Sequence, residues 1–219
     1  LRTRSFMSKH PSSSVYLASQ SPRRHALLAQ WGVTPVALLA DANEDAEALE
    51  AVLPGEAPLR YVKRVTALKL AAAADRCTRR SLPPLPVVCA DTTVALGQEI
   101  LGKPNSMAHA RRMLSLLSGQ KHVVYTAVSV GYWDARGTWQ TQQMVSRSQV
   151  RFSSLSATQI ASYVKTGEPM GKAGAYAIQG LASLFITDIS GSYSGIMGLP
   201  AFETAQLLRW SGVKLMVNV

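Results

Sequence analysis

The feature that most constrains the fold is a pair of long strand-like runs, Val123–Tyr132 and Thr138–Phe152, joined by the turn sequence DARG. Two such runs separated by a short turn are typical of an antiparallel ribbon. Nearer the N-terminus, a short apolar run at Val15–Ala18 precedes a helical segment at His25–Trp31, which Gly32 ends. Strands interleaved with helices indicate an α/β fold. The hairpins favour a mixed sheet flanked by helices over an all-parallel sheet.

Proline and glycine punctuation and apolar spacing predict the other elements. We expect strands at Val36–Leu39, at the apolar run 87–90 and at Leu184–Ile189, a hairpin at 93–102, helices from Pro58 to about Ala74 and at Ser106–Leu117, Ala157–Lys165 and Ala201–Trp210, and a loop at 77–86.

The length of the chain bounds its domain organisation. Its 219 residues are enough for a core that needs neither a disulfide nor a metal ion. We expect residues 15–219 to form one domain. Residues 1–14 contain basic residues among serines and threonines and no acid, which predicts a disordered basic tail, with a transit peptide as the alternative.

The net charge of +10, from 23 Lys and Arg against 13 Asp and Glu, favours a polyanionic partner such as a nucleotide, nucleic acid or anionic lipid. No apolar stretch approaches the roughly 20 residues that cross a membrane. Cys77 and Cys89 form no C-x-x-C pair, which predicts reduced thiols in a cytoplasmic protein. The four histidines lack metal-ligand spacing. A bound cation would therefore rely on carboxylates and water, which favours Mg²⁺ or Mn²⁺ over Zn²⁺.

Two acidic residues are candidates for chemistry. Asp91 directly follows the apolar run 87–90, and open α/β sheets bind ligands at the carboxyl ends of their strands. The alternative is a side chain that caps the following turn. Glu44 lies in an acidic stretch with Asp41 and Asp45, which a solvated acidic surface would also explain.

The sequence SPRRHALL at 21–28 combines a helix-start signal with Arg23 and Arg24. A helix start and two guanidinium groups suit an anion site, although a solvated helix end would look the same. Lys69, Lys103 and Lys172 lie near expected strand ends. Together with an acid they would suit a triphosphate–magnesium complex, whereas singly each is typical of a surface lysine.

Three further motifs contain residues that could carry chemistry. Gln179 is the second-last residue of the glycine-rich segment TGEPMGKAGAYAIQG, where its amide could read the edge of a base or simply pack in a turn. GQEILGK at 97–103 resembles part of a P-loop, but Pro104 stands where Ser or Thr is required. GSYSG at 191–195 places Tyr193 where a serine hydrolase needs its nucleophile. Neither a P-loop nor a nucleophile elbow is supported.

Taken together, the motifs resemble those of the Maf family of nucleoside triphosphate pyrophosphatases. The resemblance runs in order over roughly residues 15–210 and rests on LASQSPRR (17–24), ADTTV (90–94), LGKP (101–104), LSGQKHVVYTAV (117–128), GEPMGKAGAYAIQG (167–180) and GSYSGIMGLPAFET (191–204). Thr93 departs from the family pattern, which commonly has an apolar residue there.

The resemblance implies an elongated mixed sheet in two lobes around a central cleft, similar to the inosine triphosphate pyrophosphatases. It implies hydrolysis of a nucleoside triphosphate to the monophosphate and pyrophosphate, a requirement for Mg²⁺ or Mn²⁺, and often a homodimer. Having Gln179 in the motif AIQG resembles the pattern of the subgroup that acts on dTTP and UTP. The alternatives are the same reaction on a methylated or non-standard purine nucleotide, or a non-catalytic nucleic-acid-binding regulator of cell division, although nucleic-acid binding is not what the resemblance favours.

The resemblance also implies roles for individual residues. Asp91 matches the catalytic proton acceptor, with Glu44 as its metal-binding or water-activating partner. Substrate choice falls to Arg23, Thr92 and Gln179. The remaining positions of the cleft lining are Ser19, Arg24, Lys69, Lys103 and Lys172.

Overall fold

The computed structural model describes residues 13–42, 44 and 48–217. The expected basic tail, residues 1–14, therefore lies almost entirely outside the described residues. Ser14, its last residue, belongs to the first strand of the sheet.

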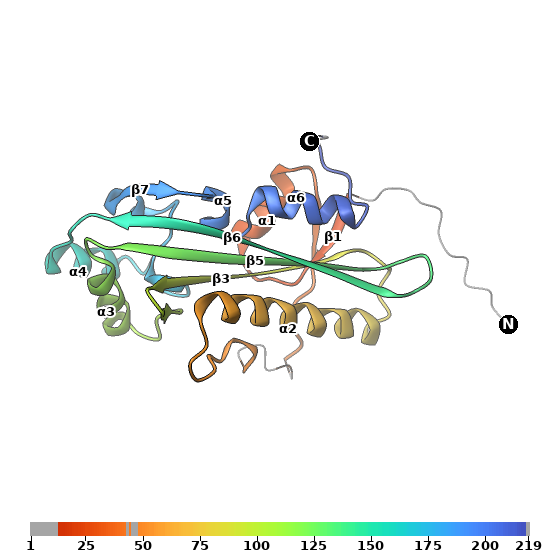
Figure 1. Cartoon of the computed structure of the whole chain (residues 1–219), viewed down its shortest axis with the longest axis horizontal. Helices are drawn as coiled ribbons and strands as arrows, with labels where there is room; N and C mark the ends of the chain where they lie inside the picture. The colour runs from red at the N-terminus through yellow and green to blue at the C-terminus, as the bar shows by residue number, and fades with distance from the viewer. Residues whose placement is uncertain (1–12, 43, 45–47, 218–219) are drawn as a thin grey trace.

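The described residues form one mixed sheet of seven strands in the order β2-β1-β3-β5-β6-β7, with β4 paired to β3 (Figure 1). Strand β1 pairs in parallel with both β2 and β3, and the remaining pairs are antiparallel. This confirms the predicted α/β fold with a mixed, elongated sheet. The strands are β1 (Ser14–Leu17), β2 (Thr34–Ala37), β3 (Val87–Leu96), β4 (Glu99–Leu101), β5 (Lys121–Trp133), β6 (Trp139–Phe152) and β7 (Ile186–Ser190).

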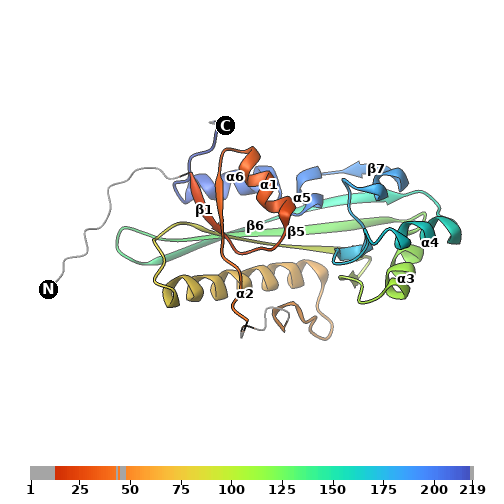
Figure 2. The same ribbon diagram turned by 180° about the vertical axis from the view of Figure 1, so that it is seen from behind.

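Helices cover both faces of the sheet. The long helix α2 lies along one face, and α1 and α6 lie on the other, as the two opposite views show (Figures 1 and 2). The helices are α1 (Pro22–Gln30), α2 (Pro58–Arg79), α3 (Met107–Leu117), α4 (Ala157–Lys165), α5 (Tyr193–Met197) and α6 (Ala201–Trp210), with 3₁₀ turns η1 (Ala48–Glu50), η2 (Ala173–Ala175) and η3 (Leu181–Phe185).

Three local predictions need correction. Helix α2 continues to Arg79, so the first residues of the expected loop at 77–86 are helical. Strand β3 does not end at residue 90 but runs to Leu96, because it pairs with β5 over residues 87–95. The strand expected at Leu184–Ile189 begins only at Ile186, because Leu184 and Phe185 belong to the 3₁₀ turn η3.

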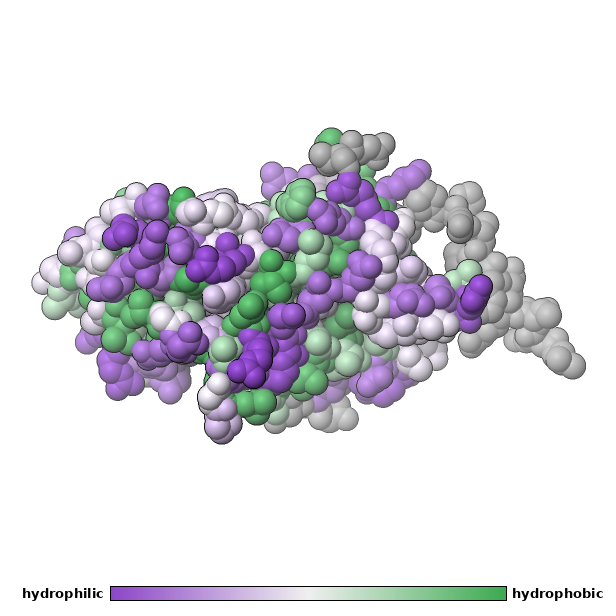
Figure 3. Space-filling model, viewed as in Figure 1, coloured by the Kyte–Doolittle hydropathy of each residue, from purple (hydrophilic) through white to green (hydrophobic). Residues whose placement is uncertain are grey.

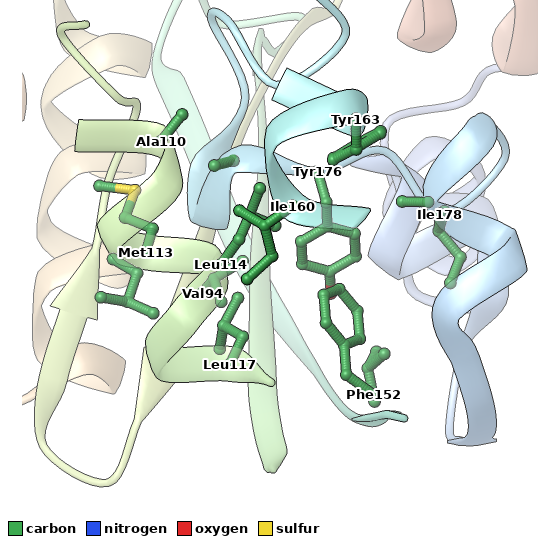
Figure 4. Close-up of a cluster of buried hydrophobic side chains, with 14 of the residues drawn as sticks. Val94, Ala110, Met113, Leu114, Leu117, Phe152, Ile160, Tyr163, Tyr176 and Ile178 are labelled. Carbon is green, nitrogen blue, oxygen red and sulfur yellow. The ribbon is translucent and has the colours of Figure 1, made fainter. Parts of the chain in front are cut away.

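Separate hydrophobic clusters support the two ends of the sheet. Near β1, a cluster between the sheet and helices α1 and α6 includes Leu17, Leu28 and Leu208. At the far end, α3 and α4 pack on the sheet through a cluster that includes Leu114 and Phe152 (Figure 4). The two lobes predicted from the sequence correspond to these two ends, joined by the long strands β3, β5 and β6.

Hydrophilic side chains cover much of the face seen in Figure 3, with apolar side chains exposed in patches between them. Among the helices of the described residues, none combines the length and the apolar character that crossing a bilayer requires. Cys77 and Cys89 are buried free thiols.

A buried histidine predicts how the fold responds to acid. His122 is 1% exposed, and its Nε2 lies 2.9 Å from the hydroxyl of Tyr176. Burial lowers the pKa of His122 from 6.5 to about 4. Below pH 6.5 the unfolded chain therefore binds a proton that the folded chain does not. We expect the free energy of unfolding to fall by about 1.4 kcal/mol per pH unit from this residue between pH 6.5 and 4.

Urea unfolding across this pH range tests the prediction. The variant His122→Gln should flatten the dependence, whereas His25→Gln, a change on helix α1, should leave it in place. An unchanged slope in His122→Gln would show that other groups cause the acid sensitivity.

Candidate active site

The candidate site forms where one edge of strand β3 has no neighbouring strand among the described residues. Strand β1 pairs with this edge at Val87 and Val88, and β4 pairs with it from Val94 onward. Between these pairings, residues 90–92 border a cleft of ≈ 690 Å³. That volume is in the usual range for small-molecule sites. The cleft lies between the two lobes, as the resemblance implied.

Neighbouring residues of β3 serve opposite faces of the sheet at this gap. Successive strand residues alternate between the two faces. Asp91 lies on the face covered by α2, where it meets Lys69. Thr92 lies on the face covered by α1, where it meets Arg24. Both line the cleft, which therefore wraps around the open edge of the strand. Asp91 was predicted to follow the end of a strand, but it lies within β3.

A lysine joins two carboxylates on the α2 side. Lys69 Nζ lies 2.6 Å from Asp91 Oδ1 and 2.7 Å from Glu50 Oε1, and Lys103 Nζ lies 2.8 Å from the other oxygen of Glu50. Burial disfavours the charged form of Lys69, but the two carboxylates outweigh it and raise the pKa of Lys69. Within the described residues, Asp91 Oδ2 has no hydrogen-bond partner. This oxygen is available to a ligand or to water.

The structure gives Glu44 partners other than those predicted. Arg76 Nη2 lies 2.5 Å from Glu44 Oε2, and Arg79 Nη2 lies 2.6 Å from Oε1. The hydrogen bond from Arg76 is the largest cause that holds the pKa of Glu44 far below its ordinary value. Glu44 does line the cleft, but the carboxylate that shares a partner with Asp91 is Glu50. The pairing of Glu44 with Asp91 through a metal ion stays a prediction.

Arg24 is held by protein acceptors at the junction of the site. Its Nε donates to the carbonyl oxygen of Gly198 at 2.7 Å, its Nη1 to Ser19 Oγ at 3.1 Å and its Nη2 to Thr92 Oγ1 at 3.5 Å. Gly198 has a φ of +119°, and a Cβ there would lie 3.4 Å from Arg24 Nε. Glycine is favoured at this position because of the positive φ.

Arg23 and Lys172 add positive charge to the same cleft. Arg23 Nε donates to the carbonyl oxygen of Met197 at 3.1 Å, and Lys172 Nζ donates to the carbonyl oxygen of Glu168 at 2.6 Å. Burial is the main cause that lowers the pKa of Lys172, with a smaller contribution from Arg23. The two cations are therefore near enough to act on one anionic ligand.

Gln179 lies in a smaller pocket of ≈ 50 Å³ that adjoins the cleft. Four residues, Arg23, Arg24, Thr92 and Ala173, line both spaces. Apart from these four residues and Gln179, the residues that line the small pocket are mostly apolar in type. They are Val94, Val124, Tyr176, Ala177, Ile178, Ile196, Met197 and Gly198.

The loop that carries Gln179 is tied down by a carboxylate. Glu168 accepts hydrogen bonds from the Tyr163 hydroxyl at 2.9 Å and from the backbone N–H groups of Leu181 and Ala182 at 2.9 and 3.3 Å. A Cβ at Gly180 would lie 2.4 Å from this carboxylate. The residue after Gln179 must therefore be glycine for the loop to close in this way.

All the predicted site residues except Gln179 line the large cleft, so the structure brings them together in space. The prediction did not include Glu50 or Thr126. Glu50 stands in a long acidic stretch, where no pattern distinguishes one carboxylate from the next. Thr126 is part of the motif LSGQKHVVYTAV, which offered a signal but no role.

Comparison with known proteins gives a consistent family. Residues 14–211 match the family model described as Maf-like protein. A dTTP/UTP pyrophosphatase from Albidiferax ferrireducens is 59% identical over 204 residues, which cover 93% of this chain and 100% of the relative. A dTTP/UTP pyrophosphatase from Ralstonia nicotianae is 58% identical over 205 residues, covering 94% and 97%.

Among solved structures, this chain is similar to a nucleoside-triphosphatase (dITP/XTP pyrophosphatase) from Mycobacterium abscessus. It aligns with a TM-score of 0.38 at 15% identity, over 63% of this chain and 74% of that one. This likeness is too low to support a conclusion. The family model, in contrast, spans nearly the whole chain, and the chain belongs to the Maf-like protein family.

Proposed function

We propose that this protein hydrolyses the bond between the α and β phosphates of dTTP and UTP, releasing the nucleoside monophosphate and pyrophosphate. The observation that carries the proposal is the Asp91–Lys69–Glu50 arrangement in a cleft continuous with the pocket of Gln179. Relatives at 58–59% identity that are named dTTP/UTP pyrophosphatase support the substrate. The small size of the pocket favours a pyrimidine ring over the larger purine.

Each part of the site has a task in this reaction. Lys69, Lys103 and Lys172 neutralise the triphosphate and the charge that develops on it. Asp91 Oδ2 orients the attacking water and accepts its proton as the oxygen of the water bonds to the α phosphorus. The bond from the α phosphorus to the bridging oxygen breaks, and pyrophosphate leaves with that electron pair.

The carboxylates of the cleft suit a hard divalent cation, because two of them already bind one positive charge. The Lys69 ammonium lies 2.6 Å from Asp91 and 2.7 Å from Glu50. Among the described residues, no group of three or more His, Cys, Asp or Glu could hold a metal ion, and Mg²⁺ is often held by one or two carboxylates together with substrate phosphates. Asp91 would hold Mg²⁺ or Mn²⁺ with Glu44 or Glu50. The ion would neutralise phosphate charge and acidify water.

Measurement of Mn²⁺ binding distinguishes Glu44 from Glu50 as the second metal ligand. If Glu50 is the second ligand, Glu50→Gln weakens Mn²⁺ binding in the presence of a non-hydrolysable nucleotide, while Glu44→Gln has little effect. The reverse result would support Glu44, as the resemblance implied.

The proposal extends to partners and location. The partner is a nucleoside triphosphate rather than nucleic acid, because the positive charge of the site lies inside a cleft of nucleotide size. A homodimer, as the resemblance implies, and a place in the cytoplasm, where buried free thiols are stable, complete it.

A panel of nucleotides tests the function. Pyrophosphate release should be fastest from dTTP and UTP with Mg²⁺ or Mn²⁺. A preference for a methylated or non-standard purine nucleotide would overturn the use of Gln179. Salt-dependent binding to duplex DNA without release of pyrophosphate from any nucleotide would favour the regulatory alternative.

The two arginines of α1 are expected to differ. Arg23→Ala should change the ratio of the dTTP and GTP rates more than Arg24→Ala. Arg24→Ala should slow the hydrolysis of both nucleotides alike and lower the Tm, since it removes a partly buried guanidinium that donates to three protein acceptors. Steady-state rates on both nucleotides measure the split. Equal losses from both variants on every nucleotide would show that the arginines form one anion site.

A further inference from the structure

Behind the cleft, two threonines on neighbouring strands form a hydrogen-bond chain that the reaction above does not use. Thr92 of β3 and Thr126 of β5 stand directly opposite each other, and their Oγ1 atoms are 2.9 Å apart. Thr126 is fully buried, and its Oγ1 donates to the carbonyl oxygen of Gly195 at 2.7 Å. The chain joins the floor of the cleft to helix α5.

The chemistry of these groups fixes the direction of every bond in the chain. A carbonyl oxygen only accepts, so the single hydroxyl proton of Thr126 goes to Gly195. Thr92 must therefore donate its own proton to Thr126. Arg24 Nη2, 3.5 Å from Thr92 Oγ1, only donates and agrees with this direction.

The result is that Thr92 offers a ligand lone pairs and no proton. Thr92 lines both the large cleft and the small pocket that holds Gln179. A ligand group that reaches Thr92 from the pocket gains a hydrogen bond only if it is a donor.

We infer that Thr126 is a positioning residue, which holds the Thr92 hydroxyl as an acceptor and thereby selects bases that present a ring N–H. Thymine and uracil both carry an imide N–H, whereas cytosine has a bare ring nitrogen at that position. The inference rests on the proposed function. It predicts that cytosine nucleotides are poorer substrates than those of thymine and uracil.

The variant Thr126→Val tests this inference because it removes the hydroxyl and keeps the shape. Gly195 would not lose its partner, since its carbonyl oxygen also accepts from the Gly198 N–H at 2.9 Å. The Thr92 hydroxyl would be free to turn and donate. We expect the ratio of kcat/KM for dTTP to kcat/KM for dCTP to fall about tenfold, the value of one hydrogen bond. Thr126→Ser, which keeps the hydroxyl, should retain the wild-type ratio.

Thr93→Val is the matched control. Thr93 is the next residue of β3, is 2% exposed and faces the opposite side of the sheet, and within the described residues its hydroxyl has no partner. This control should leave both the ratio and the Tm at or above their wild-type values. Thr92→Val should lower the ratio as much as Thr126→Val does. The double variant should lower it no further, because the two residues act as one unit.

Several results would overturn the inference. One is an equal loss on dTTP and dCTP in Thr126→Val, which would show a structural role alone. Another is an unchanged ratio in Thr126→Val while the wild type prefers dTTP, which would leave the proposed function standing. Absence of pyrophosphate release from dTTP and UTP in the wild type would overturn both. If Thr126→Val does not fold, the ratios of Thr126→Ser and Thr92→Val decide.

Discussion

Asp91→Asn is expected to remain folded and to lose about 10²- to 10⁴-fold in the rate of pyrophosphate release from dTTP, the usual effect of removing a general base. Asparagine has the same shape as aspartate but is a far weaker proton acceptor. Lys69 would still pair with Glu50 at 2.7 Å, so the ammonium would not be left without a carboxylate. We therefore expect the Tm to change by only a few degrees.

Single-turnover pyrophosphate release at saturating dTTP and Mg²⁺ measures the effect on the chemical step. Asp75→Asn is the matched control, because Asp75 is exposed on α2, and it should be as active as the wild type. Turnover of Asp91→Asn at the wild-type rate would remove Asp91 from the reaction. A rate restored by high Mg²⁺ would instead show that its main task is to hold the cation.

The ribbon β5–β6 could be predicted from sequence because its two runs are long and joined by a clear turn. Helices α4 and α6 were predicted with their observed bounds. Such local signals are the ones that sequence patterns record best.

The length of β3 could not be predicted from local pattern. The three polar residues 91–93 interrupt the apolar run, which made Asp91 appear to follow a strand. Pairing with β5 carries the strand through them. Asp91 was thus located for a mistaken reason: the cleft is open because β1 ends there, not because β3 does.

The ion-pair partners of the site carboxylates could not be predicted from the sequence for a different reason. Glu50 meets Lys69 and Lys103, which follow it by 19 and 53 positions. Glu44 is drawn to Arg76 and Arg79 on the same helix, 32 and 35 positions away. Which acidic residue pairs with which basic residue depends on how the described residues before α2 lie against that helix. The spacing of the residues in the sequence does not determine this arrangement.

Lys69→Met is expected to lower kcat/KM for dTTP by about 10²- to 10³-fold, the typical loss when one fixed positive group is removed from a reacting oxyanion. Methionine keeps the length and the apolar stem of the side chain but not its charge. Asp91 and Glu50 would then share a partly buried site without the ammonium that joins them, and each would repel the negative charge of the other.

The pH dependence gives this variant a signature that a loss of packing would not produce. In the wild type, burial raises the pKa of Glu50, but Lys69 and Lys103 outweigh it and the pKa is lowered. Without Lys69, Glu50 would lose the largest cause that lowers its pKa, so its pKa should rise and the acid limb of the rate profile should move to higher pH.

Rates measured across the acid and neutral pH range test this shift. Lys69→Arg should keep the acid limb in place, because it restores the charge. Lys63→Met, an exposed change on the same helix, should alter neither rate nor profile. If Lys69→Met slowed the reaction with an unchanged acid limb, the lysine would serve the phosphates alone.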